Sequence, residues 1–161
     1  MEQNERTAKL KSVAIYASII IFPAILFSCI LALVFVEGNS MAPNLASGSL
    51  LLCNRHAQIS TGDVVVFNGP DGKILVKRVI GTAGDEVSVH NGICTVNGVV
   101  ESSSYRNLSV GEGDDFDASV VPSGHIFVMG DNRGISLDSR DVSVGWVDLD
   151  DVICTMMVKL R

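Results

Sequence analysis

The chain starts with a long stretch in which polar positions almost disappear. Residues 12–36 carry no charge over 25 positions, and a helix of that length is roughly 37 Å long, enough to cross a bilayer core of about 30 Å. Pro23 lies inside the stretch, where a membrane helix tolerates a kink. The pattern predicts one transmembrane helix over 12–36, preceded by a short segment over 1–11.

Two other interpretations of this stretch fit less well. A cleavable signal peptide has an apolar region of only about 7 to 15 residues and then a small-x-small site, but this stretch is longer and no such site follows it. A lipid-modified cysteine at Cys29 would be followed by polar residues, whereas ILALVFV follows here. An uncleaved anchor explains the pattern better than either.

Beyond residue 36 the apolar positions form short or alternating groups bounded by Gly, Asn, Asp and Pro, which is typical of strands. The Asn-Gly pairs at 91–92 and 97–98 are tight-turn signals and predict successive hairpins. The acidic, glycine-rich segment 109–119 is expected to be a solvated loop. The pattern predicts a mostly β domain of short antiparallel strands over 37–161, with strands at 62–68, 73–81, 86–90, 93–100, 123–131 and 151–160.

The charge of the chain excludes some partners and predicts an orientation. Residues 37–161 hold 9 Lys/Arg and 16 Asp/Glu, a formal charge of −7, which disfavours nucleic acid and electrostatic adhesion to anionic lipid. Membrane lipid is therefore expected to meet the domain through apolar contact or the tether. Arg6, Lys9 and Lys11 precede the apolar stretch, so the positive-inside rule predicts a single-pass membrane protein with a cytoplasmic N-terminus and an extracytoplasmic domain.

The cysteines and histidines do not form a metal-binding pattern. Cys29 lies in the anchor, and Cys53, Cys94 and Cys154 each sit among apolar neighbours, which favours free, buried thiols for these three. No two cysteines have the spacing of a ligand pair, and the three histidines are scattered along the chain. No metal and no cofactor are expected.

Three loop-bordered segments carry more polar detail than a connection needs: 38–45, 74–87 and 129–146. In the second, Lys77 and Arg78 point to opposite faces of a strand among aliphatic residues. An enclosed arginine stays charged and needs a carboxylate, whereas an enclosed lysine can lose its proton and act as a general base. The alternative is a lysine that reaches water from an edge strand. The third segment contains Asp131 and Asp138, which supply carboxylates; alone, it also fits an ion-paired loop or a weak cation site.

In this order and behind an N-terminal anchor, the segments closely resemble the bacterial type I signal peptidases, membrane-bound Ser/Lys proteases. The resemblance covers nearly the whole chain from the anchor onward, and four motifs in sequence order make it specific. They are Ser40-Met41-x-Pro43 with Leu45; GDVVVF at 62–67; Lys77-Arg78 with Gly81 and Gly84-Asp85; and Gly130-Asp131-Asn132 with Ser136, Asp138, Ser139 and Arg140.

The resemblance implies roles for these residues. Ser40 would be the nucleophile and its backbone N–H an oxyanion donor; Lys77 would be the general base, oriented by Ser136. Asp138 with Arg78 and Arg140 would form a bracing ion network, supported by Asp131. The remaining members of the nucleophile loop would be Gly38, Asn39, Met41 and Pro43.

The chain also departs from the family pattern. Gly38 stands where many enteric members have a serine whose hydroxyl is a second oxyanion donor, and Asn44 replaces the more usual threonine. Only 44 residues separate Asp85 from Gly130, so the large insertion of enteric members is missing. The chain keeps Lys77 where eukaryotic and archaeal relatives have histidine. These features indicate the compact, Gram-positive form.

The resemblance implies a serine endopeptidase that removes signal peptides from exported preproteins by acyl-enzyme chemistry, with the secretion translocon as a further candidate partner. Four extended residues put Ser40 within about 14 Å of the end of the apolar stretch. The alternatives are a specialised peptidase for pilin, sheath or conjugation proteins and a non-catalytic relative that binds signal peptides. A self-cleaving Ser/Lys repressor conflicts with the anchor. A Ser40–His125–Asp131 triad is not needed if Lys77 is the base.

Overall fold

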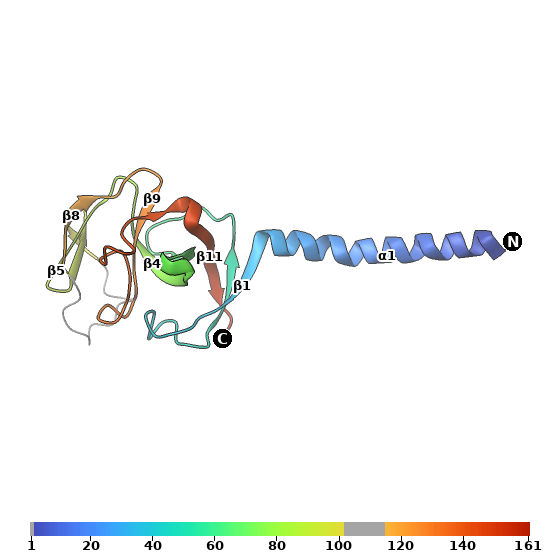
Figure 1. Cartoon of the computed structure of the whole chain (residues 1–161), viewed down its shortest axis with the longest axis horizontal. Helices are drawn as coiled ribbons and strands as arrows, with labels where there is room; N and C mark the ends of the chain where they lie inside the picture. Colours follow the sequence, from blue (N-terminus) through green and yellow to red (C-terminus); the bar gives the residue numbers. More distant parts are fainter. Residues whose placement is uncertain (1, 102–114) are drawn as a thin grey trace.

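The computed structural model describes residues 2–101 and 115–161. A single long helix, α1 (Glu2–Ile30), projects from a β domain (Figure 1). The strands are β1 (Leu31–Phe35), β2 (Leu50–Asn54), β3 (Val64–Asn68), β4 (Ile74–Thr82), β5 (Glu86–His90), β6 (Ile93–Val96), β7 (Val99–Val100), β8 (Phe116–Val120), β9 (His125–Met129), β10 (Val147–Asp148) and β11 (Val152–Lys159), with 3₁₀ turns at Pro70–Gly72 and Leu149–Asp151.

The boundary of the helix differs from the one expected over 12–36. The helix ends at Ile30, and the last part of the apolar stretch forms β1, which pairs antiparallel with β2 from Leu31↔Asn54 to Phe35↔Leu50. Leu, Val and Phe are at home in both elements, and pairing with β2 decides between them. The β domain therefore begins at residue 31, and Ser40 comes ten residues after the helix rather than four after an apolar helix ending at 36.

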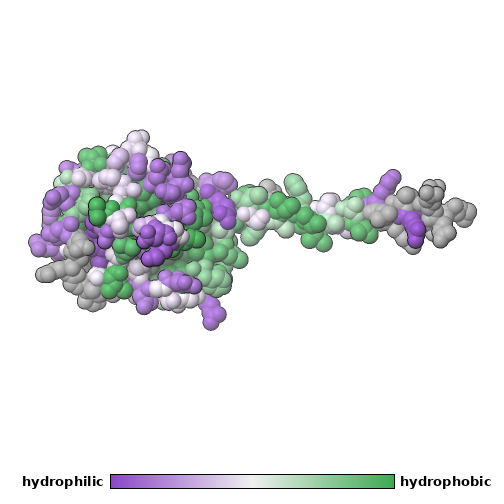
Figure 2. Space-filling view, viewed as in Figure 1, coloured by the Kyte–Doolittle hydropathy of each residue, from purple (hydrophilic) through white to green (hydrophobic). Residues whose placement is uncertain are grey.

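Large apolar side chains of α1 are exposed between Val13 and Ile30. Figure 2 shows hydrophobic residues along the part of the helix nearest the domain and charged ones further out. Val13–Ile30 is long and apolar enough to cross a membrane, and none of it is buried against the rest of the protein. Ile20 and Phe22, for example, keep 72% and 69% of their surface exposed. Such an apolar surface suggests a membrane anchor.

The larger sheet has seven strands in the order β1-β2-β11-β3-β4-β9-β10, with every neighbouring pair antiparallel. Successive antiparallel pairing makes β1 and β4 run in the same direction. The first half of β4, Ile74–Lys77, pairs with β3 alone. The second half, Arg78–Thr82, pairs with β9. Both β1 and the first half of β4 therefore present a strand edge.

The smaller sheet has the order β7-β6-β5-β8 and packs on the side of the larger sheet away from α1 (Figure 1). Its hairpins turn at Asn91-Gly92 and Asn97-Gly98, and all four residues have positive φ, which confirms the turns predicted from the sequence. Phe116 and Phe127 pack with tilted rings, Trp146 packs edge to face against both, and this cluster joins the smaller sheet to the larger one.

The loop expected at 109–119 is only partly described. Residues 102–114 lie outside the described residues, but Phe116–Val120 form β8 rather than a loop, paired with β5. Sequence reasoning missed this strand because Asp117 and the neighbouring acidic residues hide its alternation.

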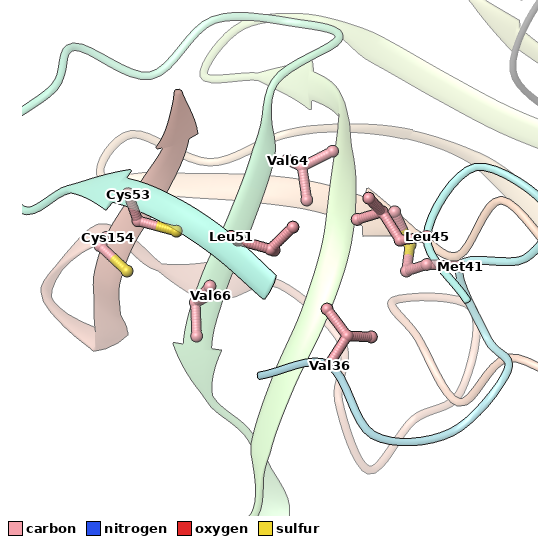
Figure 3. Packing of buried hydrophobic residues seen from close by; sticks show 8 residues of the cluster. All are labelled: Val36, Met41, Leu45, Leu51, Cys53, Val64, Val66 and Cys154. Atoms are coloured by element: carbon pink, nitrogen blue, oxygen red, sulfur yellow. The ribbon is translucent and has the colours of Figure 1, made fainter. Parts of the chain in front are cut away.

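The loop that carries Ser40 is held by the core of the larger sheet. Met41 and Leu45 are 1% and 3% exposed and pack with Val64 and the other labelled residues of Figure 3. Backbone bonds from Val36 to Ser49 (2.9 Å) and from Gly48 to Val36 (2.8 Å) close the base of the loop. Because its side chains reach the core, the loop is a rigid part of the domain rather than a free connection.

The cysteines of the domain are free, as expected. Cys53, Cys94 and Cys154 are buried, and Cys29 is exposed on α1. Cys53 on β2 and Cys154 on β11 lie side by side (Figure 3). Their hydrogen bond, together with burial, raises the pKa of the Cys53 thiol well above its usual range, so this thiol is a packing group rather than a nucleophile.

Candidate active site

Ser40 lies in the closed loop between β1 and β2. The backbone enters it through Gly38 at φ 85°, a left-handed conformation that L side chains rarely adopt. A side chain at this position would be strained, so glycine suits this part of the loop. The loop continues through a cis peptide bond between Ala42 and Pro43. It presents the half-buried Ser40 towards β4.

Lys77 reaches Ser40 from β4. Its Nζ lies 2.8 Å from Ser40 Oγ and donates a second hydrogen bond to the backbone oxygen of Val76 at 3.0 Å. The residue is 2% exposed. This burial lowers the pKa of Lys77 from 10.5 to about 8, although the charges of Asp138 and Asp131 act in the opposite direction. A neutral amine in contact with a hydroxyl is the arrangement that general-base catalysis requires.

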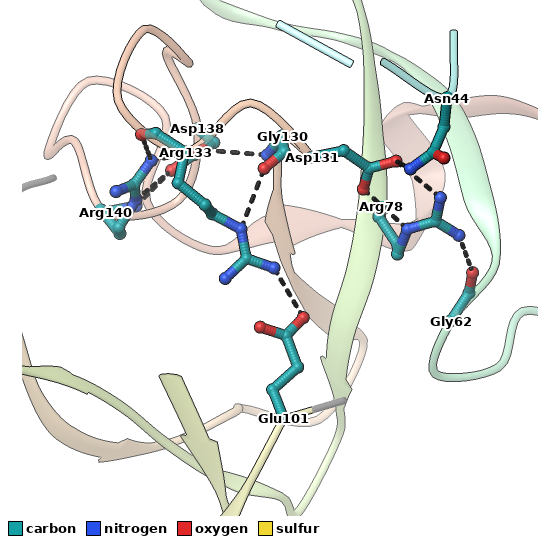
Figure 4. Close-up of polar contacts among 9 residues, drawn as sticks. All are labelled: Asn44, Gly62, Arg78, Glu101, Gly130, Asp131, Arg133, Asp138 and Arg140. Carbon is teal, nitrogen blue, oxygen red and sulfur yellow. Dashed lines mark hydrogen bonds and ion pairs between the residues drawn. The ribbon is translucent and has the colours of Figure 1, made fainter. Parts of the chain in front are cut away.

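Arg78, the next residue, lies on the other face of β4 and is fully paired. Its Nε and Nη2 donate to the two carboxylate oxygens of Asp131 at 2.8 and 2.7 Å, and its Nη1 donates to Gly62 O at 2.7 Å (Figure 4). Asp131 is 0% exposed. The strand alternation thus encloses both cations, and the arginine obtains the carboxylate that its permanent charge needs.

The partners in the ion network differ from the expected ones. Asp138 was expected to form the network with both Arg78 and Arg140; the ion pair that the described residues show for it is with Arg140, at 2.9 Å. Arg78 pairs with Asp131 instead. The register explains the change: Arg78 lies opposite Met129 on β9, and Asp131 follows Met129 by two residues.

Asp138 and Asn132 brace the nucleophile loop through the segment that follows β9. Asp138 Oδ2 accepts from Gly130 N at 3.0 Å. Asn132 N donates to Ser40 O at 2.9 Å, and its Nδ2 donates to Asn39 O at 3.1 Å. Asn132 was part of the matched motif without an assigned role, and these two bonds give it one.

Ser136 is close to the site, but its expected hydrogen bond with Lys77 is not formed in this structure. Its buried Oγ has no hydrogen-bond partner among residues 2–101 and 115–161. It lies against Gly130, where a side chain would collide with Ser136 Oγ and with the backbone oxygen of Ser40. Gly130 therefore permits the close approach of the two segments.

Sequence reasoning missed a third buried ion pair. Arg133 Nη2 donates to Glu101 Oε1 at 2.7 Å, and the two side chains are 6% and 4% exposed. Arg133 Nε also donates to Gly130 O at 3.0 Å. The pair joins the segment that follows β7 to the segment that follows β9 (Figure 4). The 32 positions between the partners left no local signal by which the sequence could predict it.

A cleft of about 740 Å³ opens beside the two catalytic candidates. One wall is β1 and the other is the first half of β4, with Val66 and Ile153 between them. His125, in contrast, lines a different cavity, and its Nδ1 lies 3.0 Å from Ser123 O. No group of three His, Cys, Asp or Glu side chains within the described part of the chain could hold a metal ion.

Comparisons with known proteins agree with this geometry. The family model described as "Signal peptidase, peptidase S26" matches residues 9–160. A signal peptidase I of Bacillus amyloliquefaciens is 39% identical over 66% of this chain and 62% of its own length, and one of Bacillus licheniformis is 33% identical over 92% of this chain and 88% of its own. The chain thus spans less than two thirds of the first of these relatives.

The fold comparison points the same way. The crystal structure of a signal peptidase I from Enterococcus faecalis matches with a TM-score of 0.50 and 29% identity, covering 60% of this chain and 94% of that one. The expected mostly β fold behind one apolar helix is confirmed. The alternative of a specialised or non-catalytic relative is not favoured by these matches.

Proposed function

The chain belongs to the signal peptidase family, peptidase S26, and from this we propose that it is a membrane-anchored serine endopeptidase that removes signal peptides from exported preproteins, with Ser40 as nucleophile and Lys77 as general base. The observation that carries the proposal is the 2.8 Å contact between Lys77 Nζ and Ser40 Oγ at the edge of the cleft. No hydroxyl other than that of Ser40 is needed as the nucleophile.

The proposed reaction has two halves, and in each of them Lys77 takes up one proton and gives it back. Ser40 Oγ attacks the scissile carbonyl carbon while its proton passes to the neutral Nζ of Lys77. The tetrahedral intermediate collapses, the C–N bond breaks, and Lys77 returns the proton to the leaving amine. Water then hydrolyses the ester between the signal peptide and Ser40, with Lys77 as base again. The Ser40 N–H would stabilise the oxyanion.

The two strand edges that flank the cleft suggest how a peptide would bind. An extended chain can add to an exposed edge through main-chain hydrogen bonds, and here β1 and β4 offer parallel edges on the two sides. The apolar part of a signal peptide stays in the membrane, next to the end of α1. The residues before the cut would therefore run from the helix end of the cleft towards Ser40.

The same arrangement favours small side chains near the cut. In an extended peptide the residues one and three before the cut point to the same side. The cleft between the strands is lined there by Val34, Val66, Val76 and Ile153, so those two side chains would meet an apolar floor. We expect alanine to be accepted at both positions and phenylalanine or lysine to be rejected just before the cut.

We further propose that residues 1–11 are cytoplasmic and the β domain extracytoplasmic. The cations that precede the apolar stretch support this orientation through the positive-inside rule. Bilayer lipid would surround α1, and the secretion translocon would deliver the substrate. Protease added to sealed membrane vesicles tests the orientation. The β domain should be digested in vesicles whose extracytoplasmic face is outside and protected in inverted vesicles.

The deciding experiment is cleavage of a preprotein by the full-length protein in non-ionic detergent. The substrate carries alanine one and three residues before the expected cut, and mass spectrometry locates the new termini. Matched substrates with phenylalanine or lysine just before the cut, and the Ser40→Ala enzyme, serve as controls. Efficient cutting after lysine, or undiminished cutting by Ser40→Ala, would refute the proposed function.

A further inference from the structure

The nucleophile loop is tied to the buried ion pair as well as to Lys77. Asn44 Nδ2 donates to Asp131 Oδ2 at 2.8 Å, on the same carboxylate that Arg78 holds with two hydrogen bonds (Figure 4). Because Asp131 is completely buried, each of its hydrogen bonds fixes the position of the partner strongly. The side chain of Asn44 is therefore anchored at a fully buried, ion-paired carboxylate beside the site.

This bond closes a ring that contains both catalytic candidates. Ser40 and Asn44 are four residues apart in one compact loop, and Lys77 and Arg78 are consecutive on β4. The loop meets the strand once at Ser40–Lys77, at 2.8 Å, and again through Asn44, Asp131 and Arg78. The second contact constrains the distance across the first.

The backbone around Asn44 is held as well, so the side chain has a firm base. Leu45 N donates to Met41 O at 2.9 Å, and Lys159 Nζ near the end of β11 donates to Asn44 O at 3.1 Å. Both Met41 and Leu45 are buried. A shift of Asn44 would consequently be passed to Ser40 through a turn with little freedom.

We propose that Asn44 is a positioning residue for the Ser40–Lys77 pair, with its amide N–H fixing the nucleophile loop on the Asp131–Arg78 ion pair. This inference rests on the proposed function. The chemistry at this position requires a neutral donor. Arg78 already balances the charge of Asp131, so a second carboxylate beside Asp131 would place an uncompensated negative charge next to it.

Two substitutions separate positioning from general support. Asn44→Ala removes the donor without adding charge. Asn44→Asp keeps the shape but supplies a donor only when the carboxyl group it introduces is protonated, which the proximity of Asp131 favours at lower pH. The charged groups around the substituted side chain are Asp131, Arg78 and Lys159, with Lys77 and Asp138 at the site itself, and they are the same in both variants. The ratio of the two activities therefore reports on the donor.

The test measures kcat and KM for the preprotein in detergent between pH 6 and 9, with thermal melts of each variant. Asn44→Ala should lower kcat by about 10- to 100-fold, the size of effect that a misplacement near 1 Å produces, and change KM by less than about threefold. The activity of Asn44→Asp relative to Asn44→Ala should rise as the pH falls. Asn68→Ala, an exposed asparagine at the far end of β3 from the Arg78 pairing, is the matched control and should behave as the parent.

The outcomes distinguish this inference from the proposed function. The positioning role is wrong if the parent cleaves and Asn44→Ala retains at least about half of the parent's kcat. It is also wrong if the ratio of the activity of Asn44→Asp to that of Asn44→Ala does not change with pH. If Asn44→Ala does not fold, the pH dependence of Asn44→Asp relative to the parent decides by the same criterion. A parent that cleaves no preprotein overturns the proposed function, and this inference with it.

Discussion

Lys77 and Arg78 follow one another on β4 but lie on opposite faces of the strand, in opposite surroundings. Arg78 has a complete set of acceptors, with two oxygens of Asp131 and the carbonyl of Gly62 at 2.7–2.8 Å. Lys77 is more deeply buried than Arg78, and it contacts a hydroxyl and a carbonyl instead of a carboxylate. One face stabilises a positive charge, and the other disfavours it.

The difference shows how one strand can hold both a structural and a reactive cation. A buried charge paired with a carboxylate remains charged and fixes geometry. A buried amine without such a contact has a lowered pKa and becomes a base near neutral pH. Asp131 and Asp138 are close enough to raise the pKa of Lys77 somewhat, but desolvation outweighs them and leaves it at about 8.

The largest expected effect is on cleavage activity and concerns the Lys77 face of β4. Ser40→Ala and Lys77→Ala should each reduce cleavage by at least about 10³-fold, and the double mutant should be hardly worse, because members of one catalytic unit are not additive. Arg161→Ala, which removes an exposed cation after β11, controls for loss of charge and should stay within a few-fold of the parent. Loss of activity in His125→Ala as large as in Lys77→Ala would show that the base has been misassigned.

The Arg78 face should show its effect in stability. Asp131→Asn leaves Arg78 enclosed without its counter-charge and should lower the free energy of unfolding by about 3–5 kcal/mol. Asp150→Asn, in an exposed turn, is the control and should change it by less than about 0.5 kcal/mol. Urea unfolding in detergent, followed by the fluorescence of the single Trp146, measures both. A loss under about 1 kcal/mol for Asp131→Asn would mean that the pair is dispensable.

Removing the amine of Lys77 should have the opposite effect on stability. Because the pKa of Lys77 is lowered on folding, the folded protein binds fewer protons than the unfolded chain between pH 8 and 10.5. Stability therefore rises with pH in that window, and below pH 8 the cost of enclosing the charged amine is fully present. Lys77→Met should be inactive, yet about 1–3 kcal/mol more stable than the parent at pH 7.

The pH dependence of the stability gained by Lys77→Met serves as the control for this prediction. The advantage of Lys77→Met should shrink as the pH rises from 8 towards 10.5, because the parent amine loses its charge there. A melting temperature of Lys77→Met far below that of the parent at pH 7 would show that Lys77 carries a stabilising charge, as Arg78 does.

The smallest expected effect is on the pH profile of the parent. With a pKa of about 8, the neutral fraction of Lys77 increases roughly tenfold between pH 7 and pH 9. We expect kcat to increase by about the same factor and to level off above that range. Initial cleavage rates at saturating preprotein measure it, with thermal melts to show that the enzyme stays folded. A flat profile would mean that Lys77 does not change protonation during the reaction.

Part of this arrangement could be predicted from the sequence. Alternation along 74–80 indicated that Lys77 and Arg78 face different ways, and the resemblance to signal peptidases, now confirmed at the level of the family, named Ser40 and Lys77. The strand alternation needs only local information. The mostly β fold followed from short patterns of the same kind, and it too is confirmed.

The rest depended on contacts between distant parts of the chain. A continuous apolar run gives no periodicity that separates helix from strand, so β1 became visible only through its pairing with β2. The choice of Asp131 over Asp138 for Arg78 follows from the β4–β9 register, which includes an irregularity between Val79 and Gly81. The Glu101–Arg133 pair and the Asn44–Asp131 bond join segments 32 and 87 positions apart.

The junction between α1 and β1 has a mechanical consequence for a protein held in a bilayer. Ile30 ends the helix and Leu31 begins the strand, and Arg55 N donates to Ile30 O at 2.8 Å, which pins the joint from the side. Since β1 is also a wall of the cleft, tilting the helix applies a torque to that wall. Bilayer thickness sets the tilt of a membrane helix. We therefore expect lipid composition to change the rate of the proposed reaction through the shape of the cleft.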